Sequence, residues 1–417
     1  MVLDTKVIAL VVVALVIGLA IGYGVASAIS GGVVTTVTVT PEKKVYYIGF
    51  TLPLSGELSS IGKVWEKVVQ LAIEDLNREV QAYGFNVEFR PMILDDGTTE
   101  EKALQNVQSF AYQGIKVIIG PAASAQVKVV KSYVDDNKIV LISPSSTAPT
   151  LAIPNDYVFR AVGSDAGQAK ALAALAYQEG ARKVIVFHRN DEYGNAFADF
   201  LEKYFKEMGG TVVKLSYQTG LSDYASEVAT LASRVQSEGA DAVILISFDT
   251  DGANILSHAA ESEILSSIRW FVSEGPHGAK ELLSPAIGRF ASKVKLFGTR
   301  PLFIANPLYE DFKNRMKQRF GEEPGVFSEN LYDAIKLAGW AILRAGVYDG
   351  EAIRAALIEV AKTYYGPSGW TIFDFAGDKA QQDYGVWAII PGPEGYQFKD
   401  VGLYERDTIT FLEQAYP

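Results

Sequence analysis

The chain has 417 residues, of which 48% are hydrophobic and 21% charged, a balance typical of a globular α/β protein with two or three domains. A formal net charge of −11 and the lack of a basic stripe disfavour nucleic acid as a partner. Because the chain has no cysteine, and its three histidines are not spaced as metal ligands, we expect no disulfide bond, metal site or cofactor.

The N-terminal segment indicates a location. No charged residue lies between Lys6 and Glu42, and this stretch contains more than the roughly 20 apolar residues that a helix needs to cross a bilayer. We therefore expect residues 1–30 to anchor the protein at the extracytoplasmic face of a cell membrane. The small residues at 26–28 favour the alternative, a cleaved signal peptide and a secreted protein. Residues 31–43 are predicted to form an extended extracytoplasmic linker.

From residue 46 onward, short apolar runs alternate with amphipathic segments. The first run is YYIGFTL, and in the helix predicted after it Val64, Val68, Leu71 and Ala72 recur on one face. The strands predicted in this part of the chain are 46–52, 85–94, 116–120 and 138–142, with a helix between each pair.

The same alternation restarts at residue 165. Its predicted strands are 183–187, 211–215, 242–247 and 268–272, each preceded by a helix. Strands that alternate with helices of this length form parallel sheets covered on both faces. So many strands fit two sheets better than one. The predicted fold class is therefore α/β, with two Rossmann-like lobes.

The last part of the chain is mostly helical and too poor in strands for a third lobe. Its predicted helices are 308–320, 329–345 and 351–362, and its predicted strands are 386–390 and 397–401. We expect these elements to return and complete the two lobes, through a hinge that the chain crosses several times. The predicted division is 44–160 plus 297–370 for the first lobe and 161–296 plus 371–417 for the second.

Four loops that follow predicted strands carry small or polar residues, namely 53–62, 121–126, 144–149 and 272–278. Ligands of parallel α/β sheets bind beyond the carboxyl ends of the strands, so these loops are expected to face one cleft. Their hydroxyls and helix N-termini suit a carboxylate, through Ser124, Ser145, Ser146 and Thr147. Glu274 suits an α-ammonium. For any single loop a helix cap or a solvated charge is the better interpretation, but all four together predict a site for a zwitterion.

Short motifs occur along the chain in the order IGFTLPLSGELSSIGK, AIEDLN, DD, KVIIGPAAS, ISPSSTAP, FRAVGSD, DEYGNAF, SEG, YDA and YYGPSG. Each is weak alone. In this order, from residue 46 to the C-terminus, the chain resembles type I periplasmic binding proteins of the leucine/isoleucine/valine-binding class. The resemblance implies the type I periplasmic binding protein fold, no catalytic residue, lobes that close around a small-molecule ligand, and delivery of that ligand to an ABC transporter permease.

The resemblance also implies roles for particular residues. Ser124 and the backbone of Thr147 would hold the carboxylate of an amino-acid ligand. The carbonyl of Ser145, the hydroxyl of Thr147 and the carboxylate of Glu274 would take its ammonium group. Tyr193, in the DEYG motif, would close over the ligand from the second lobe.

The sequence departs from the class where the ligand's side chain would lie. Ile61 stands where the class often has an aromatic ring, and either Phe248 or Asp249 stands where it has a tyrosine. Ile61 and Phe248 would favour a branched-chain or other apolar amino acid, whereas an inward Asp249 would favour a polar or cationic side chain. Trp65 is better interpreted as a core residue than as part of the pocket.

Other classes of function are less favoured. Asp95 and Asp96 point to opposite faces of a strand end, which fits a turn better than paired catalytic acids. The first strand–helix turn lacks GxGxxG, which disfavours a nucleotide-dependent enzyme. A ligand-sensing ectodomain for a signalling partner, or a binder of an amide or another small polar solute, are the alternatives. With no signalling region in the chain, we favour a transport receptor.

Overall fold

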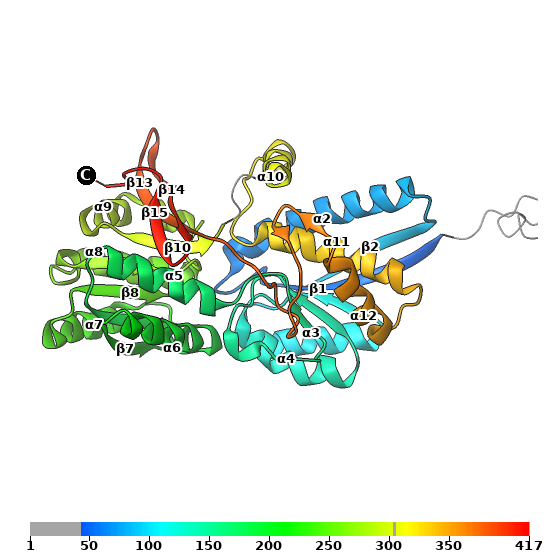
Figure 1. Cartoon of the computed structure of the whole chain (residues 1–417), viewed down its shortest axis with the longest axis horizontal. Coiled ribbons are helices and arrows are strands. Elements are labelled where there is room, and N and C mark those ends of the chain that lie inside the picture. Colours follow the sequence, from blue (N-terminus) through cyan, green and yellow to red (C-terminus); the bar gives the residue numbers. More distant parts are fainter. Residues whose placement is uncertain (1–42, 303–305, 417) are drawn as a thin grey trace, which may run out of the picture. The chain divides into compact units, whose positions relative to one another are not determined.

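The computed structural model describes residues 43–302 and 306–416 (Figure 1). Its strands form a five-stranded sheet, an eight-stranded sheet and a two-stranded ribbon. The predicted anchor (1–30), and the predicted linker (31–43) except its last residue, lie outside the described residues. Within the described ranges, no helix combines the length and the apolar character needed to span a membrane.

The five-stranded sheet has the order β2-β1-β3-β4-β5, and its pairs β1/β3, β3/β4 and β4/β5 are parallel. Its strands are β1 (Lys44–Leu52), β2 (Val87–Asp95), β3 (Val117–Ile119), β4 (Val140–Ser143) and β5 (Val158–Arg160). The helices along this part of the chain are α2 (Ser59–Ala82), α3 (Glu100–Tyr112), α4 (Ser124–Asp136) and the 3-10 turn η1 (Pro149–Leu151). Sequence analysis predicted all of these strands except β5, which is too short to show a period.

The eight-stranded sheet has the order β15-β14-β13-β10-β9-β8-β6-β7. Its strands are β6 (Lys183–Arg189), β7 (Thr211–Tyr217), β8 (Ala242–Ile246), β9 (Arg269–Val272), β10 (Phe297–Pro301), β13 (Tyr384–Gly392), β14 (Gly395–Glu405) and β15 (Thr408–Phe411). Strands β6 to β10 pair in parallel, whereas β13 to β15 are antiparallel. The helices are α5 (Asp165–Gln178), α6 (Glu192–Glu207), α7 (Ala225–Glu238), α8 (Asp249–Glu261) and α9 (Pro285–Val294), with the 3-10 turns η2 (Leu265–Ser267) and η3 (Lys280–Leu283).

Strand β10 corrects one predicted boundary. The sequence-based division assigned residues from 297 onward to the first lobe, but β10 lies between β9 and β13 in the eight-stranded sheet. Helix α9 supplies the crossover from β9 to β10 and so continues the series of βαβ units. The strand reads FGTRP, which carries no apolar run that would have predicted it. The rest of the division stays a prediction.

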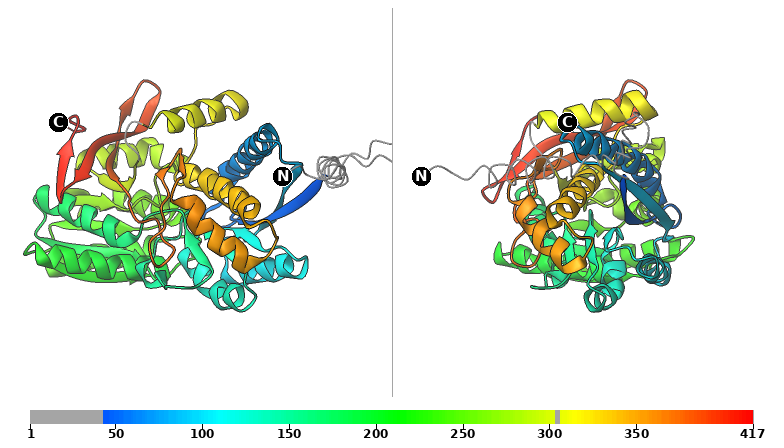
Figure 2. Two further views of the ribbon diagram at one scale, coloured as in Figure 1. Left: turned by 45° about the vertical axis from the view of Figure 1, so that its right-hand side comes forward. Right: turned by 90° about the vertical axis from the view of Figure 1, so that its right-hand side faces the viewer.

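The late helices follow β10, and two of them return to the five-stranded sheet. The late helices are α10 (Pro307–Phe320), α11 (Ser328–Ala345) and α12 (Gly350–Ala361), followed by the short strands β11 (Tyr365–Gly366) and β12 (Gly369–Trp370). Helix α11 contacts β3 and β4, and α12 contacts β4, although α5 to α9 separate them in sequence. Figures 1 and 2 show α11 and α12, in yellow to orange, beside the cyan elements. Strands β13 to β15 then extend the other sheet.

The chain separates into two compact units. Among the described residues, the smaller comprises 43–46 and 77–90. Within its described part, the side chain of Asn77 hydrogen-bonds to both backbone groups of Phe89, at 2.9 and 2.8 Å, and the rings of Tyr46 and Phe89 stack with centroids 5.8 Å apart. The larger unit comprises residues 47–76 and 91–417. It contains every residue of the candidate site.

Candidate ligand-binding site

A pocket in the larger unit is lined by the segments that follow β1, β3, β4, β6, β8 and β9 and by the residues before α11. It has about 380 Å³ of space between atoms, including solvent at its mouth. The carboxyl ends of parallel strands are where α/β sheets place their ligands. The lining residues are Leu58, Ile61, Ala122, Ala123, Ser124, Ser145, Thr147, Tyr193, Phe248, Glu274, Gly275, Val326 and Phe327.

All but one of the residues predicted for the site line this pocket. They are Ile61, Ser124, Ser145, Thr147, Tyr193, Phe248 and Glu274. The exception is Ser146, which is buried behind Ser124. Its hydroxyl donates to the Ser124 hydroxyl at 3.1 Å, and its backbone N–H donates to Ser143 Oγ, also at 3.1 Å. Ser146 therefore supports Ser124 and does not face the pocket.

Sequence analysis missed part of the lining. Leu58, Ala122, Ala123 and Gly275 lie next to predicted residues, in loops that had been singled out by their position after strands. Val326 and Phe327 come from the segment that joins α10 to α11, for which no pattern indicated a site. Phe327 has a φ of 62°, in the left-handed region, and precedes the first residue of α11.

The hydroxyl of Ser124 is arranged to donate a hydrogen bond. Ser124 is the first residue of α4, and its Oγ accepts from the hydroxyl of Ser146 at 3.1 Å and from the backbone N–H of Ala148 at 3.3 Å. A hydroxyl has two acceptor positions and one proton. Because both acceptor positions are engaged, the proton of Ser124 is left for a group inside the pocket.

Two buried carboxyl groups lie in and behind the same pocket. Glu274 is 3% exposed, and its Oε2 accepts from Nε2 of Gln168 at 2.5 Å. Asp165 is fully buried, and its Oδ2 accepts from the hydroxyl of Thr147 at 2.7 Å. Burial raises the pKa of Glu274 to about 7. Burial, and then the charge of Glu274, raise the pKa of Asp165 well above its ordinary value. These hydrogen-bond partners, Gln168 and Thr147, are neutral.

An aromatic pair forms another part of the lining. The rings of Tyr193 and Phe248 stack with centroids 5.4 Å apart and planes 21° from parallel, and Tyr193 donates to Ser273 Oγ at 3.0 Å. Phe248 lines the pocket, whereas Asp249 does not, since its carboxylate accepts a hydrogen bond from Ser60. Of the two residues that sequence analysis left open, Phe248 is therefore the one at the pocket.

Trp65 is a core residue, as the sequence analysis favoured. It is fully buried and is not part of the pocket lining. Its Nε1 donates to the backbone carbonyl of Val326 at 3.3 Å. The indole therefore fixes the backbone of a lining residue and does not face the pocket itself.

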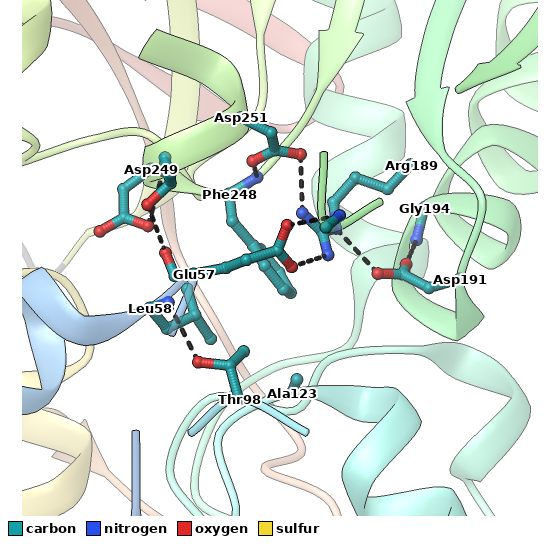
Figure 3. A network of polar contacts seen from close by, with 12 residues as sticks. Glu57, Leu58, Thr98, Ala123, Arg189, Asp191, Gly194, Phe248, Asp249 and Asp251 are labelled. Carbon is teal, nitrogen blue, oxygen red and sulfur yellow. Dashed lines mark hydrogen bonds and ion pairs between the residues drawn. The ribbon is translucent and has the colours of Figure 1, made fainter. Parts of the chain in front are cut away.

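Arg189 lies beside the pocket and contacts three carboxylates, as Figure 3 shows. Its guanidinium donates to Asp251 at 2.6 Å and to Asp191 and Glu57 at 2.8 Å each. The Cζ atom of the guanidinium lies 3.7 Å from the ring centroid of Phe248. We call Arg189 with Glu57, Asp191 and Asp251 the Arg189 cluster. It touches the pocket through Phe248.

Glu57 brings the loop after β1 into the Arg189 cluster. The other members lie at the end of β6, just after it, and in α8 after β8. Beyond its ion pair, the second carboxylate oxygen of Glu57 accepts from the backbone N–H of Gly220 at 3.0 Å. Its carbonyl accepts from the hydroxyl of Thr250 at 2.8 Å. Three separate bonds therefore hold this loop of the five-stranded sheet against loops of the eight-stranded sheet. The structure has the two sets of loops in direct contact.

Asp95 and Asp96 stabilise a turn. Asp95 accepts from the backbone N–H groups of Ser55 and Gly97 at 3.0 and 2.9 Å. Asp96 accepts from the hydroxyl of Thr51 at 3.1 Å and from the backbone of Thr98 at 2.8 Å. Neither lines the pocket. In residues 43–302 and 306–416, no group of three or more histidine, cysteine, aspartate or glutamate residues could hold a metal ion.

Comparison with known proteins gives matches over most of the chain. A family model described as periplasmic binding protein matches residues 45–389. A leucine-, isoleucine-, valine-, threonine- and alanine-binding protein of Pseudomonas aeruginosa is 24% identical over 339 residues, covering 80% of this chain and 87% of its own length. An uncharacterized protein of Methanocaldococcus jannaschii is 29% identical over 395 residues, covering 90% of this chain and 93% of its own length.

The fold is that of solved binding proteins. One is the substrate-binding protein of a branched-chain amino acid transporter from Streptococcus pneumoniae, in complex with isoleucine. It matches with a TM-score of 0.72 at 21% identity, covering 86% of this chain and 100% of its own. This likeness confirms the predicted α/β fold of the type I periplasmic binding proteins. The family model spans most of the chain, so the protein belongs to the periplasmic binding protein family, whose members bind solutes and are not enzymes.

Proposed function

We propose that this protein binds an α-amino acid with an apolar side chain, a branched-chain one above all, and delivers it to an ABC transporter. The observation that carries the proposal is that a hydrogen-bond donor and an acceptor carboxylate line the same pocket. Ser124 offers a free proton there, and Glu274 offers a buried carboxylate. A zwitterion is the kind of ligand that satisfies both.

The start of α4 supports a carboxylate subsite. Ser124 stands at the first position of this helix, where backbone N–H groups lack partners within the helix and the helix dipole favours an anion. The hydroxyl proton of Ser124 can also donate to a carboxylate, because both acceptor positions of that hydroxyl are already occupied. We assign the ligand carboxylate to Ser124 and to the backbone of Thr147.

Glu274 supports an ammonium subsite. A carboxylate that is 3% exposed and bonded to a neutral amide remains costly to ionise. The positive charge of a ligand removes much of that cost and supplies N–H donors to Glu274, Thr147 and the carbonyl of Ser145. Hydrogen bonds to charged groups contribute about 1.5–3 kcal/mol each. A few of them suffice for micromolar binding, which corresponds to about −8 kcal/mol.

The remaining lining supports an apolar side chain. Leu58, Ile61, Phe248, Val326 and Phe327 contribute hydrocarbon or aromatic surface to the pocket. Asp249, the residue that would have favoured a cationic side chain, is directed to Ser60. The Pseudomonas aeruginosa relative is named for binding leucine, isoleucine, valine, threonine and alanine, which agrees with this chemistry.

Calorimetric titration of the solubilised full chain with a panel of amino acids, amides and sugars tests the proposed ligand. We expect leucine, isoleucine and valine to bind, and Glu274→Gln to weaken them by about tenfold or more. Glu179→Gln is the matched control, because Glu179 pairs with Arg269 outside the pocket, and it should leave affinity unchanged. Binding of sugars alone, or equal affinities for the two variants, would contradict the proposal.

Extracytoplasmic location and anchoring by residues 1–30 are part of the same proposal. The charge-free segment between Lys6 and Glu42 and the periplasmic family support it. Mass spectrometry of the membrane fraction should find the intact N-terminus, whereas a chain beginning near residue 29 would show cleavage and release. Purification of the membrane complex should bring along a permease. Recovery of a signalling protein in its place would favour a sensor ectodomain.

A further inference from the structure

The hydroxyl of Thr147 lines the pocket, but its proton is already used. It donates to Oδ2 of Asp165 at 2.7 Å, and the backbone N–H of Asp165 donates back to the carbonyl of Thr147 at 2.9 Å. Thr147 is 2% exposed and Asp165 is fully buried, so water does not compete for this contact. Two hydrogen bonds therefore hold the threonine in one orientation.

This arrangement gives Thr147 the opposite character to Ser124. A hydroxyl whose single proton is donated elsewhere can offer only its lone pairs. The Thr147 oxygen can therefore accept from an N–H group of a ligand, but it cannot donate to a carboxylate or a carbonyl. Ser124, with both acceptor positions filled, can do the reverse.

The charges around Asp165 reinforce this selectivity. Glu274, in the segment after β9, adds a second negative charge to the same buried region, and Arg160 on β5 supplies a positive one. Arg160 is itself committed to Asp378, with its Nε 2.5 Å from Oδ1. Oδ1 of Asp165 accepts no hydrogen bond from any described residue. Arg160 also donates to the carbonyls of Ser146 and Ala148, on either side of Thr147, at 3.4 and 2.6 Å. The guanidinium near Thr147 is thus bonded to Asp378 and to backbone carbonyls, and Asp165 is paired with a neutral hydroxyl.

The remaining titratable groups that face Asp165 are two tyrosines. Tyr193 lies on α6 and Tyr384 on β13, and each interacts electrostatically with Asp165. Burial raises the pKa of both hydroxyls well above the ordinary value for tyrosine. Both therefore stay neutral at physiological pH, and neither supplies a positive charge.

We infer that Asp165 is a positioning residue that makes Thr147 a hydrogen-bond acceptor and thereby restricts this part of the pocket to an ammonium group. The inference rests on the proposed function and goes beyond it, because it names the residue that separates α-amino acids from their α-hydroxy analogues. A hydroxyl in place of the ammonium carries no positive charge to balance Asp165 and Glu274. The ligand hydroxyl has only one proton to donate, whereas Thr147 and Glu274 are both acceptors that each need a donor.

The test is the ratio of affinities for L-leucine and for 2-hydroxy-4-methylpentanoate, its α-hydroxy analogue, measured by calorimetry on the full chain. If another amino acid of the panel binds more tightly, that one and its hydroxy analogue are used. Asp165→Asn should lower the preference for the amino acid by about tenfold. Asp333→Asn is the matched control. Asp333 is also buried, but it bonds to Tyr364 and Ser368 away from the pocket, so the ratio should not change.

A second variant keeps the inference testable if Asp165→Asn folds poorly. Thr147→Val removes the accepting oxygen and leaves Asp165 in place, and it should lower the same ratio. Because the two residues act through one contact, the double variant should show no further fall. Additive effects, or an unchanged ratio in Asp165→Asn, would overturn the inference while the proposed function stands. A wild-type protein that binds no α-amino acid would overturn both.

Proton release on ligand binding is a further measurement, and it would not change in Asp165→Asn if Asp165 had only a structural role. An ammonium group favours the ionised form of Glu274, whose pKa burial raises to about 7, so leucine binding near pH 7 should release protons. The heat of binding should then depend on the ionisation enthalpy of the buffer. Asp165→Asn should release fewer protons than wild type, and Asp333→Asn the same number. Equal release in Asp165→Asn and wild type would count against the inference.

Discussion

The pocket and the Arg189 cluster each contain buried carboxyl groups, but they differ in how their negative charge is balanced. In the cluster, three carboxylates bond to one guanidinium whose residue is 2% exposed. In the pocket, Asp165 and Glu274 bond to the neutral groups of Thr147 and Gln168. Buried charge without a counter-charge is expensive. The charge of the cluster is therefore balanced within the protein, whereas in the pocket the proposed ligand would supply the balancing charge.

The two regions meet at Phe248. The ring of Phe248 stacks on Tyr193 in the pocket and also contacts the guanidinium of Arg189. The same guanidinium bonds to Glu57, which joins the loops of the two sheets. A side chain that lines the pocket thus touches the group that holds the loops together. Variants in either region can separate the contribution to folding from the contribution to binding.

The largest expected effect is on folding, from Arg189→Met. Removing the guanidinium leaves the fully buried carboxylate of Asp251 without a positively charged partner. Breaking a buried ion pair in this way costs about 3–5 kcal/mol. We expect the free energy of unfolding in urea to fall by that amount. Arg269→Met is the control, since Arg269 forms an ion pair with Glu179 at a partly exposed position. Its loss should cost about 1 kcal/mol or less. Equal losses of unfolding free energy in the two variants would show that the Arg189 cluster stabilises the fold no more than a partly exposed ion pair does.

The next effect is a pH dependence of the ligand-free protein. The pKa of Glu274 is raised to about 7 in the folded state from an ordinary 4.5. Between these values the folded chain binds more protons than the unfolded chain, so the free energy of unfolding should fall as the pH rises from about 4.5 to about 7. This group alone can account for up to about 3 kcal/mol.

Urea unfolding at pH 5 and pH 8 measures this slope. Asp165 acts in the same direction, since its pKa is also raised, so Glu274→Gln should reduce the slope without abolishing it. Saturating leucine should reduce it as well, because the ammonium stabilises the ionised carboxylate. If the free energy of unfolding fell equally with pH in wild type and in Glu274→Gln, Glu274 would not carry an unbalanced buried charge. The contrast between the pocket and the Arg189 cluster would then be wrong.

The smallest effect is on the lifetime of the complex, from Glu57→Gln. The variant weakens the contact between the loop after β1 and Arg189, while Asp191 and Asp251 keep the guanidinium paired. We expect leucine to dissociate roughly tenfold faster, equivalent to about 1.4 kcal/mol, with little loss of folding stability. Stopped-flow release measures this rate. Lys128→Met breaks a more exposed ion pair, between Lys128 on α4 and Glu192 on α6. It should change the dissociation rate by less than about twofold.

Much of the fold was predictable because the relevant signals are local. Apolar runs such as KVIIG and AVILIS identified buried strands, and the amphipathic segments between them identified helices. Strands β5, β10, β11, β12 and β15 were missed. All but β10 have four residues or fewer, and β10 contains glycine, arginine and proline. Only the pairing of β10 with β9 and β13 showed to which sheet it belongs.

The sequence by itself determined that Ser124, Thr147, Phe248 and Glu274 would come together, because each follows a parallel strand and the carboxyl ends of such strands share an edge. Tertiary structure alone decided how these groups act. Ser124 is a donor because of Ser146 and Ala148, and Thr147 is an acceptor because of Asp165. Val326, Phe327 and the pairing of Glu57 with Arg189 likewise depend on segments that are distant in the chain. Neighbours in space set the direction of a hydrogen bond and the balance of a buried charge. A local sequence pattern does not reveal those neighbours.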